Sequence, residues 1–358
     1  MNTSIPAPHT EPFVGGIVHP TLYLWDAWSY SEDGKTHLYC LAVSRNDRDG
    51  RRLDPAKRNE RPFHVRHFVS GDNGKTWTDA GCFQEPRIGS GLFDSRTIWS
   101  GSIAPLSDGN KLVAYTGVRE SGPDLTFQQS IGLALSRDGS KADHLYDEPI
   151  SCSYRDWQTI TDLGYYLDDK SNLGNQNGEA GGPILAWRDP LIYIENDAIH
   201  LFWGAKLGSH QSALAHATIS EGSGGYVISE LFEPVTVPDG HEFTQLELPK
   251  ILHDHAGGRY YLLISTCNRL YEGQTDAEVD KRVRLYSSSS SNGPWVPAGK
   301  DGSTILRDDC HMFGLTVLDA DFEAGELWCV SPYTDAADDE RSLTISEPFA
   351  VDLARPGS

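Results

Sequence analysis

The chain has 358 residues, and its 51 aspartates and glutamates against 30 lysines and arginines give a formal net charge of −21 at pH 7. This balance argues against nucleic acid or an anionic membrane as a partner, because phosphate groups are bound by clustered lysine and arginine. No run of about 18 apolar residues is present, so no membrane-spanning helix is expected. The 35 glycines, 20 prolines and 9 tryptophans, with only 2 methionines, disfavour a helical bundle. The length allows two average domains or one large all-β domain.

The N-terminal residues show no secretory signal, because MNTSIPAPHTEPFVGG lacks a basic stretch followed by an apolar one. None of the six cysteines forms a CxxC pair, so we expect buried free thiols rather than disulfides and no zinc site. Free thiols suit the cytoplasm, and secretion without a signal of the usual type is the alternative. The cysteines are Cys40, Cys82, Cys152, Cys267, Cys310 and Cys329.

Short apolar segments bounded by turn residues follow one another along the chain. They are rich in β-branched and aromatic residues and predict strands. The stretch SGDNGKTW at 70–77 matches the Asp-box pattern S-x-D-x-G-x-x-W, which we interpret as a structural hairpin anchored by Trp77. The segments are THLYCLAVS, KLVAYTGV, IGLALS, AIHLFWGAK, GRYYLLIST, RVRLYSSS and ELWCVSP.

Five segments could each begin a four-stranded unit: LYLWDAW, WSGSIAP, AWRDPLIYI, LELPKILHD and HMFGLTVLD. Counted from residues 26, 100, 189, 247 and 311, they are 74, 89, 58 and 64 residues apart, which leaves room for four short strands each time. This layout predicts a five-bladed β-propeller of antiparallel blades over residues 1–358, as one catalytic domain with a short N-terminal extension of about residues 1–18. A pair of β-sandwiches is the alternative. Residues 47–61 and 168–182 are irregular insertions that we expect at the rim of a site.

Three of the predicted inner strands contain a carboxylate within an apolar run: Asp26, Asp189 and Glu247. Each has a structural alternative, such as a turn cap for Asp26, an ion pair for Asp189 or a charged strand edge for Glu247. A carboxylate in such a strand is costly unless it is paired or functional. Their joint occurrence on three inner strands favours a shared pocket. Two carboxylates about 5–5.5 Å apart would make a retaining glycosidase.

Other chemistries have less support. The sequence contains no G-x-S-x-G elbow and no glycine-rich phosphate loop between a strand and a helix. The 13 histidines are scattered, so no metal or other cofactor is implied.

The motifs LWDAW (24–28), WSGS (99–102), WRDP (187–190) and E-x-P (247–249) together resemble the levansucrase and inulosucrase family, which includes β-fructofuranosidases. That family belongs to a clan of five-bladed propeller glycosidases with the invertases and arabinanases. RDP alone occurs across the clan, whereas the motifs in this order are more specific to the family.

The resemblance implies a role for each matching residue. Asp26 would be the nucleophile that forms a fructosyl-enzyme, Asp189 the transition-state stabiliser and Glu247 the general acid/base. Ser100 would hydrogen-bond the nucleophile. The remaining contacts of the fructosyl pocket would be Trp25, Trp99 and Arg188.

Two positions beside the acid/base depart from the family pattern D-E-x-E-R-P, because this chain reads TQLELP at 244–249. Gln245 replaces a glutamate and Leu248 an arginine, and both family residues help to hold the glucosyl half of sucrose or an acceptor. Arg269 could supply the missing guanidinium, with Gln245 as a further substrate contact. Ser29 follows Trp28 where the family has proline, and the calcium ligands of many secreted members have no match.

The resemblance therefore implies cleavage of a β-fructofuranosyl bond in a small sugar such as sucrose, with water or a sugar as acceptor. The altered acceptor side favours hydrolysis or short-product transfer over polymer synthesis. One alternative is another furanosidase of the clan, acting on an arabinofuranosyl or unusual fructosyl linkage. A sugar-binding propeller without catalysis is the other.

Overall fold

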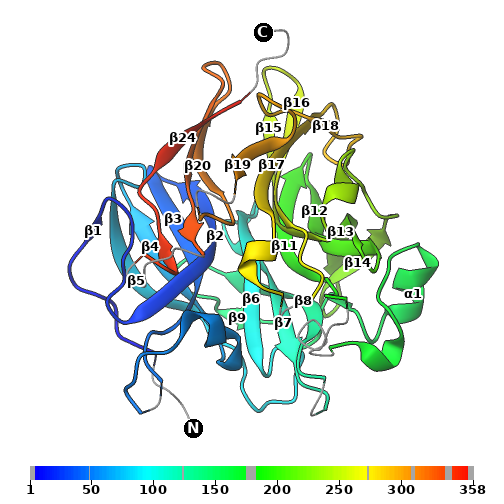
Figure 1. Cartoon of the computed structure of the whole chain (residues 1–358), viewed down its shortest axis with the longest axis horizontal. Coiled ribbons are helices and arrows are strands. Elements are labelled where there is room, and N and C mark those ends of the chain that lie inside the picture. Colours follow the sequence, from blue (N-terminus) through cyan, green and yellow to red (C-terminus); the bar gives the residue numbers. More distant parts are fainter. Residues whose placement is uncertain are drawn as a thin grey trace.

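Strands arranged as successive antiparallel sheets dominate the computed structural model, which describes residues 5–47, 49–122, 125–174, 183–271, 274–307, 311–334 and 341–353. In Figure 1 the sheets follow one another around the centre in chain order, from blue to red. This is the five-bladed β-propeller expected from the spacing of the motifs, and the sandwich alternative is wrong. None of the helices in the described ranges is long and apolar enough to cross a membrane.

The first two blades each place the earliest of their long strands innermost. In blade 1 the order from the inside is β2, β3, β4 and β5, with β1 added to the outer edge; in blade 2 it is β6, β7, β8 and β10, with β9 also paired to β8. The bounds are β1 Phe13–Val14, β2 Leu22–Glu32, β3 Lys35–Ser44, β4 His64–Ser70, β5 Thr76–Gln84, β6 Thr97–Pro105, β7 Lys111–Arg119, β8 Gln128–Ser136, β9 His144–Leu145 and β10 Ser151–Cys152.

Blades 3 and 4 repeat this order. Blade 3 runs β11, β12, β13 and β14, and blade 4 runs β15, β16, β17 and β18, with β19 also paired to β17. The bounds are β11 Arg188–Glu195, β12 Ala198–Gly208, β13 Gln211–Gly222, β14 Gly225–Leu231, β15 Gln245–Asp254, β16 Arg259–Cys267, β17 Lys281–Ser288, β18 Val296–Pro297 and β19 Thr304–Arg307.

Blade 5 is smaller and closes the ring. It pairs β20 (Thr316–Asp321), β21 (Glu326–Val330) and β24 (Phe349–Asp352), and a separate pair joins β22 (Pro332–Tyr333) to β23 (Thr344–Ile345). Its inner strand begins at Thr316, later than the residue 311 from which the sequence spacing was counted. The amide and carbonyl of Ile17 pair with those of Ile345 at 2.9 and 3.1 Å, and Leu24 N–H donates to the Leu343 carbonyl at 2.8 Å. Segments from the two halves of the chain thereby hold the first and last blades together.

The helices are short and lie between strands. The one α-helix in the described ranges is α1 (Trp157–Asp162), and the 3-10 turns are η1 (Pro55–Glu60), η2 (Lys170–Asn172), η3 (Gly240–Glu242) and η4 (Asp276–Glu278).

A hydrophobic cluster fills each interface between adjacent blades. Because successive side chains of a strand point to opposite faces, a strand inside a blade can supply two clusters. In β12, Leu201 and Trp203 pack toward blade 2, whereas Phe202 packs toward blade 4. The same arrangement recurs between blades 1 and 2, 4 and 5, and 5 and 1. Burial on both faces explains why these strands are nearly continuous apolar runs.

The Asp box forms the hairpin between β4 and β5, as predicted. The Ser70 hydroxyl donates to Asp72 at 2.8 Å, and Asp72 in turn accepts from the Thr76 amide at 2.8 Å. Gly74 has a φ of +84°, and a β-carbon there would lie 2.6 Å from Leu318 of blade 5, so glycine is required. Trp77 is completely buried in the cluster between blades 5 and 1.

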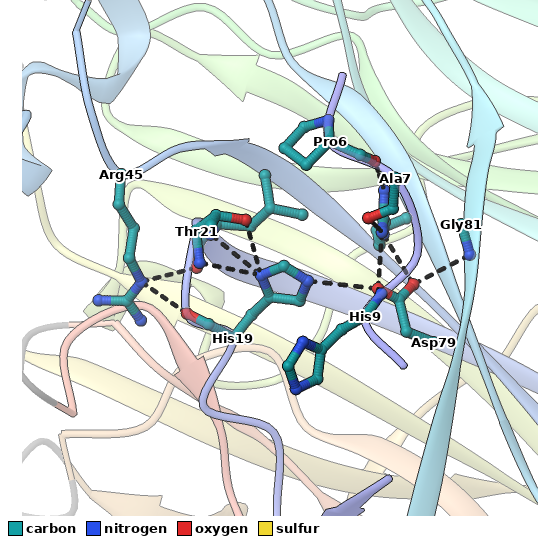
Figure 2. A network of polar contacts seen from close by, with 10 residues as sticks. Pro6, Ala7, His9, His19, Thr21, Arg45, Asp79 and Gly81 are labelled. Carbon is teal, nitrogen blue, oxygen red and sulfur yellow. Dashed lines mark hydrogen bonds and ion pairs between the residues drawn. The ribbon is translucent and has the colours of Figure 1, made fainter. Parts of the chain in front are cut away.

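A buried network of polar contacts fastens the N-terminal segment to the outside of blade 1 (Figure 2). The Asp79 carboxylate on β5 accepts hydrogen bonds from Arg66, at 2.8 and 2.6 Å, and from the His9 amide at 2.7 Å. His19 lies 3.3 Å from the same carboxylate. Arg66 also donates to the carbonyls of Pro6 and Ala7. Burial alone would raise the pKa of Asp79, but these hydrogen bonds hold it well below its ordinary value.

We expect Asp79→Ala to destabilise the protein by about 3–5 kcal/mol, because it leaves the Arg66 guanidinium buried without its partner. Urea unfolding followed by circular dichroism measures this loss. The matched control is Glu148→Ala, whose ion pair with Arg155 is exposed at 3.5 Å and should contribute less than about 1 kcal/mol. Equal stability of the two variants would contradict the structural role assigned to Asp79.

Candidate active site

A pocket of about 660 Å³ receives side chains from the inner strands of blades 1 to 4. All nine residues that the sequence analysis predicted for a site line this pocket, although they come from segments that span more than two hundred positions. They are Trp25, Asp26, Trp99, Ser100, Arg188, Asp189, Gln245, Glu247 and Arg269.

Each of the four inner strands is interrupted where it meets the pocket. Pairing with the next strand shifts register between Trp25 and Ala27, between Trp99 and Gly101, between Arg188 and Leu191, and between Glu247 and Lys250. A β-bulge of this kind turns a side chain away from the regular alternation of the strand. The bulges therefore direct polar side chains onto the propeller axis.

Three residues at these bulges have a backbone conformation that residues other than glycine rarely adopt. Asp26, Asp189 and Leu248 have φ of 43°, 61° and 53°. Such strain persists only where the surrounding structure enforces it, and it is common at functional sites. The prolines of RDP and ELP lie inside the last two bulges, which is where a strand can accommodate a residue without an N–H.

Asp26 lies at the base of the pocket and accepts a hydrogen bond from the Ser100 hydroxyl at 2.8 Å. Burial raises its pKa to about 6, and the negative charge of Glu247 adds to this rise. The Ser100 hydrogen bond and the positive charges of Arg58 and Lys250 act in the opposite direction. The carboxylate is therefore poised to titrate close to neutral pH.

Asp189 is almost fully enclosed, with 5% of its side chain exposed. Its amide donates to the Thr116 hydroxyl at 2.8 Å, and its carboxylate accepts from the Leu248 amide at 3.3 Å. Burial raises its pKa, and the charges of Glu247 and Asp26 also favour the protonated form, whereas Arg188 opposes them. Asp26 and Glu247 thus lie close enough to Asp189 to influence its ionisation.

Arg188 contacts two carboxylates, Asp189 and Glu247. Glu247 is the more accessible of them, with 22% of its side chain exposed. The Arg188 Nη2 atom donates to its carboxylate at 2.8 Å, and the Arg188 Nε atom lies 3.8 Å from Asp189. Arg188 is held in turn by the Leu185 carbonyl, which accepts from its Nη1 atom at 2.8 Å. One guanidinium therefore orients two of the three carboxylates.

Aromatic rings form walls of the pocket. Trp25 meets Phe63 edge-to-face with ring centroids 4.6 Å apart, and Trp99 lies 5.8 Å from Phe127. The glycine of WSGS is required for a steric reason, because a β-carbon at Gly101 would lie 2.0 Å from the Ala114 carbonyl oxygen.

The positions that depart from the family pattern have different surroundings. Gln245 is buried, lines the pocket and accepts a hydrogen bond from Arg188 at 3.2 Å. Leu248 does not line the pocket, and its side chain lies against Gly314, just before the inner strand of blade 5. Arg269 lines the pocket wall and donates to the Gln274 carbonyl at 2.6 Å.

Several pocket residues were missed by sequence reasoning. Arg58 and Asn59 come from η1, within the insertion at 47–61 that was expected at the rim. Arg58 lies over the ring of Trp25 at 5.7 Å. Of the second insertion, Gly174 lines the pocket, whereas residues 175–182 lie outside the described residues. No motif marks these residues, because their place depends on how a loop returns to the ring.

The cysteines that the structure describes are free thiols, and Cys310 lies outside the described residues. The described ranges contain no group of three or more histidine, cysteine, aspartate or glutamate side chains arranged to hold a metal ion.

Comparison by sequence finds a levansucrase relative. A levansucrase of Streptococcus salivarius is 25% identical over 311 residues, which covers 71% of this chain. The match spans only 30% of the length of the streptococcal protein. No protein-family model matches the chain.

Comparison by structure finds the same fold. A Bacillus subtilis levansucrase variant in complex with oligosaccharides aligns with a TM-score of 0.64 at 16% identity, covering 93% of this chain and 86% of that one. A Bacillus megaterium levansucrase variant gives a TM-score of 0.64 at 16% identity, covering 93% and 84%. The family resemblance of the motifs is confirmed: the chain is a homologue of levansucrase and has the levansucrase fold.

Proposed function

We propose that this protein is a retaining glycosidase that cleaves a β-fructofuranosyl bond, with sucrose or a related fructoside as substrate. The observation that carries the proposal is the convergence of Asp26, Asp189 and Glu247, from three inner strands, in one pocket with Ser100 and Arg188. Homology to levansucrase supports a fructosyl-transferring glycosidase. Solved levansucrases with sucrose and with oligosaccharides share its fold.

In the proposed mechanism Asp26 attacks the anomeric carbon of the fructosyl unit and forms a covalent intermediate. The bond to the leaving sugar breaks as Glu247 gives its proton to the leaving oxygen. Glu247 then takes a proton from water or a sugar hydroxyl, which attacks the intermediate and releases Asp26. The accessibility of Glu247 fits a group that exchanges protons with both a leaving group and an incoming acceptor.

The other residues hold these groups in place. The Ser100 hydroxyl fixes one oxygen of Asp26, which leaves the other oxygen to attack. Asp189, oriented by the Leu248 amide, would accept hydrogen bonds from fructosyl hydroxyls and stabilise positive charge that develops on the sugar ring. Trp25 and Trp99 would pack on the apolar faces of the sugar.

We expect Asp26→Asn to lower kcat on sucrose by about 10⁴-fold and Glu247→Gln by about 10²–10⁴-fold, because each removes a group that takes part in bond making or breaking. Release of glucose and fructose measures the effect. Asp254→Asn is the matched control, since Asp254 lies on the same strand as Glu247 and caps the exposed turn through the Gly257 amide. Wild-type turnover in the Asp26 and Glu247 variants would exclude these roles.

The pH dependence follows from the raised pKa of Asp26. The nucleophile must be ionised, so kcat/KM on sucrose should fall tenfold per pH unit below about 6. An ordinary aspartate, with a pKa of 3.8, would instead keep full activity down to about pH 5. A profile of kcat/KM from pH 4 to 9 separates the two cases, and a fall in activity only near pH 4 would contradict the raised pKa of Asp26.

The products should be free fructose and short transfer products, because Gln245 replaces the acidic family residue on the acceptor side and Leu248 faces away from the pocket. Chromatography after incubation with sucrose measures this. In the presence of methanol, retention predicts methyl β-fructofuranoside, which NMR identifies; the α-anomer would refute a retaining mechanism. If the protein cleaved an aryl arabinofuranoside and not sucrose, its substrate would be another furanoside.

A further inference from the structure

Strand β7 places a buried hydroxyl group between two of the inner strands that form the pocket. Thr116 is completely enclosed, and it pairs with Trp99 of β6 at the last regular position before the bulge that follows Trp99. The residue does not line the pocket, so a sugar bound there would not touch it. Its side chain instead takes part in the contact between blades 2 and 3.

The Thr116 hydroxyl makes one hydrogen bond as a donor and one as an acceptor. It donates to the Ser100 carbonyl at 3.3 Å and accepts from the Asp189 amide at 2.8 Å. A hydroxyl can do both at once, because it has one donor and two acceptor sites. The side chain of Ser100 in turn donates to Asp26 at 2.8 Å. One oxygen atom therefore connects the residue that holds the proposed nucleophile with the residue that supplies the second carboxylate.

The chain of contacts continues into blade 4. The Asp189 carboxylate accepts from the Leu248 amide at 3.3 Å, and Leu248 directly follows Glu247 in the sequence. The hydrogen bonds thus begin at the nucleophile on blade 1 and reach the backbone beside the proposed acid/base on blade 4. Thr116 lies at the centre of this chain, because the contacts of Ser100 lie on one side of it and those of Asp189 on the other.

The backbone is irregular at both partners of Thr116, so regular strand pairing does not fix their positions. Ser100 falls within the bulge between Trp99 and Gly101, and Asp189 has a φ of 61°. A bulge disrupts the ladder of backbone hydrogen bonds, and the buried groups that it releases need other partners. The Thr116 hydroxyl is such a partner for one carbonyl and one amide. Valine would have the shape of threonine at this position but could make neither bond.

We propose that Thr116 is a positioning residue whose hydroxyl, by joining Ser100 to Asp189, sets the distance between the nucleophile and the stabilising carboxylate. The inference rests on the proposed function, since it gives the hydroxyl a task in that reaction. Reacting groups must be held within about 0.5 Å of their working positions, and a displacement of about 1 Å can lower a rate by about 100-fold. A residue that does not touch the sugar can therefore have a large effect on turnover.

The first test measures kinetics on sucrose. Thr116→Val keeps the shape of the side chain and removes the hydroxyl, so kcat should fall by about 10–100-fold while KM changes by less than about threefold. Thr116→Ser restores the hydroxyl and should return kcat to within about threefold of wild type. A wild-type kcat in Thr116→Val, or a kcat in Thr116→Ser as low as in Thr116→Val, would overturn the proposal.

The matched control is Ser346→Ala in blade 5. The Ser346 hydroxyl is also buried and accepts from a backbone amide, that of Ser331, at 3.0 Å, and neither residue lines the pocket. Thr116→Val and Ser346→Ala each remove the acceptor of one buried amide, so both should lower the midpoint of urea unfolding. Only Thr116→Val should also lower kcat. An equal loss of kcat in the two variants would mean that both hydroxyls act through stability, and would overturn the proposal.

A crystallographic comparison separates this inference from the proposed function. In Thr116→Val the distance between the Asp26 and Asp189 carboxylates should differ from that in wild type by more than about 0.5 Å. If wild type cleaves no sugar, the proposed function fails, and this comparison still decides the role of Thr116. If Thr116→Val does not fold, Thr116→Ala takes its place in both measurements with the same expected results. An unchanged distance in the folded variant would overturn the proposal.

Discussion

Three carboxylates line one pocket, and the close approach of these acidic groups explains much of the architecture around them. Burial acts on Asp26 and Asp189, and the charge of Glu247 acts on both. Opposite charge is supplied within the pocket by Arg188, which donates to Glu247 and lies 3.8 Å from Asp189. Hydrogen bonds from the Ser100 hydroxyl and the Leu248 amide add to this stabilisation. Without such partners burial would favour the protonated forms of Asp26 and Asp189, and the proposed chemistry needs an ionised nucleophile.

The geometry of that arrangement depends on short hydroxyl side chains between neighbouring blades. Inner strands of a propeller do not pair with one another, so their relative positions need other contacts. The Thr116 hydroxyl links β7 to Asp189, and Ser102 accepts from the Ile192 amide at 2.8 Å. Ser29 donates to the Val317 carbonyl at 2.8 Å and so joins blade 1 to blade 5. At this position the family pattern has proline, and the serine here makes a bond that proline could not.

The sequence allowed the blade count and the floor of the pocket to be predicted, because both depend on local patterns. Inner strands are marked by carboxylates or WSGS within apolar runs, and the prolines of RDP and ELP mark the bulges. The walls could not be predicted in the same way. Arg58 reaches the pocket through a loop and a 3-10 turn, so it has no signal in its own segment. Leu248 has a positive φ, and its side chain lies against Gly314, which no pattern in its own segment indicates.

The pairing of Ile17 with Ile345 joins residues 328 positions apart, and it affects how the pocket forms during folding. The pocket has no complete wall within one blade, since residues from blades 1 to 4 and from the closing segments of blade 5 line it. A sugar that touches them all recognises the closed ring and not its separated parts. Ligand binding and ring closure are therefore linked equilibria, in which occupancy of the pocket stabilises the seam between blades 5 and 1.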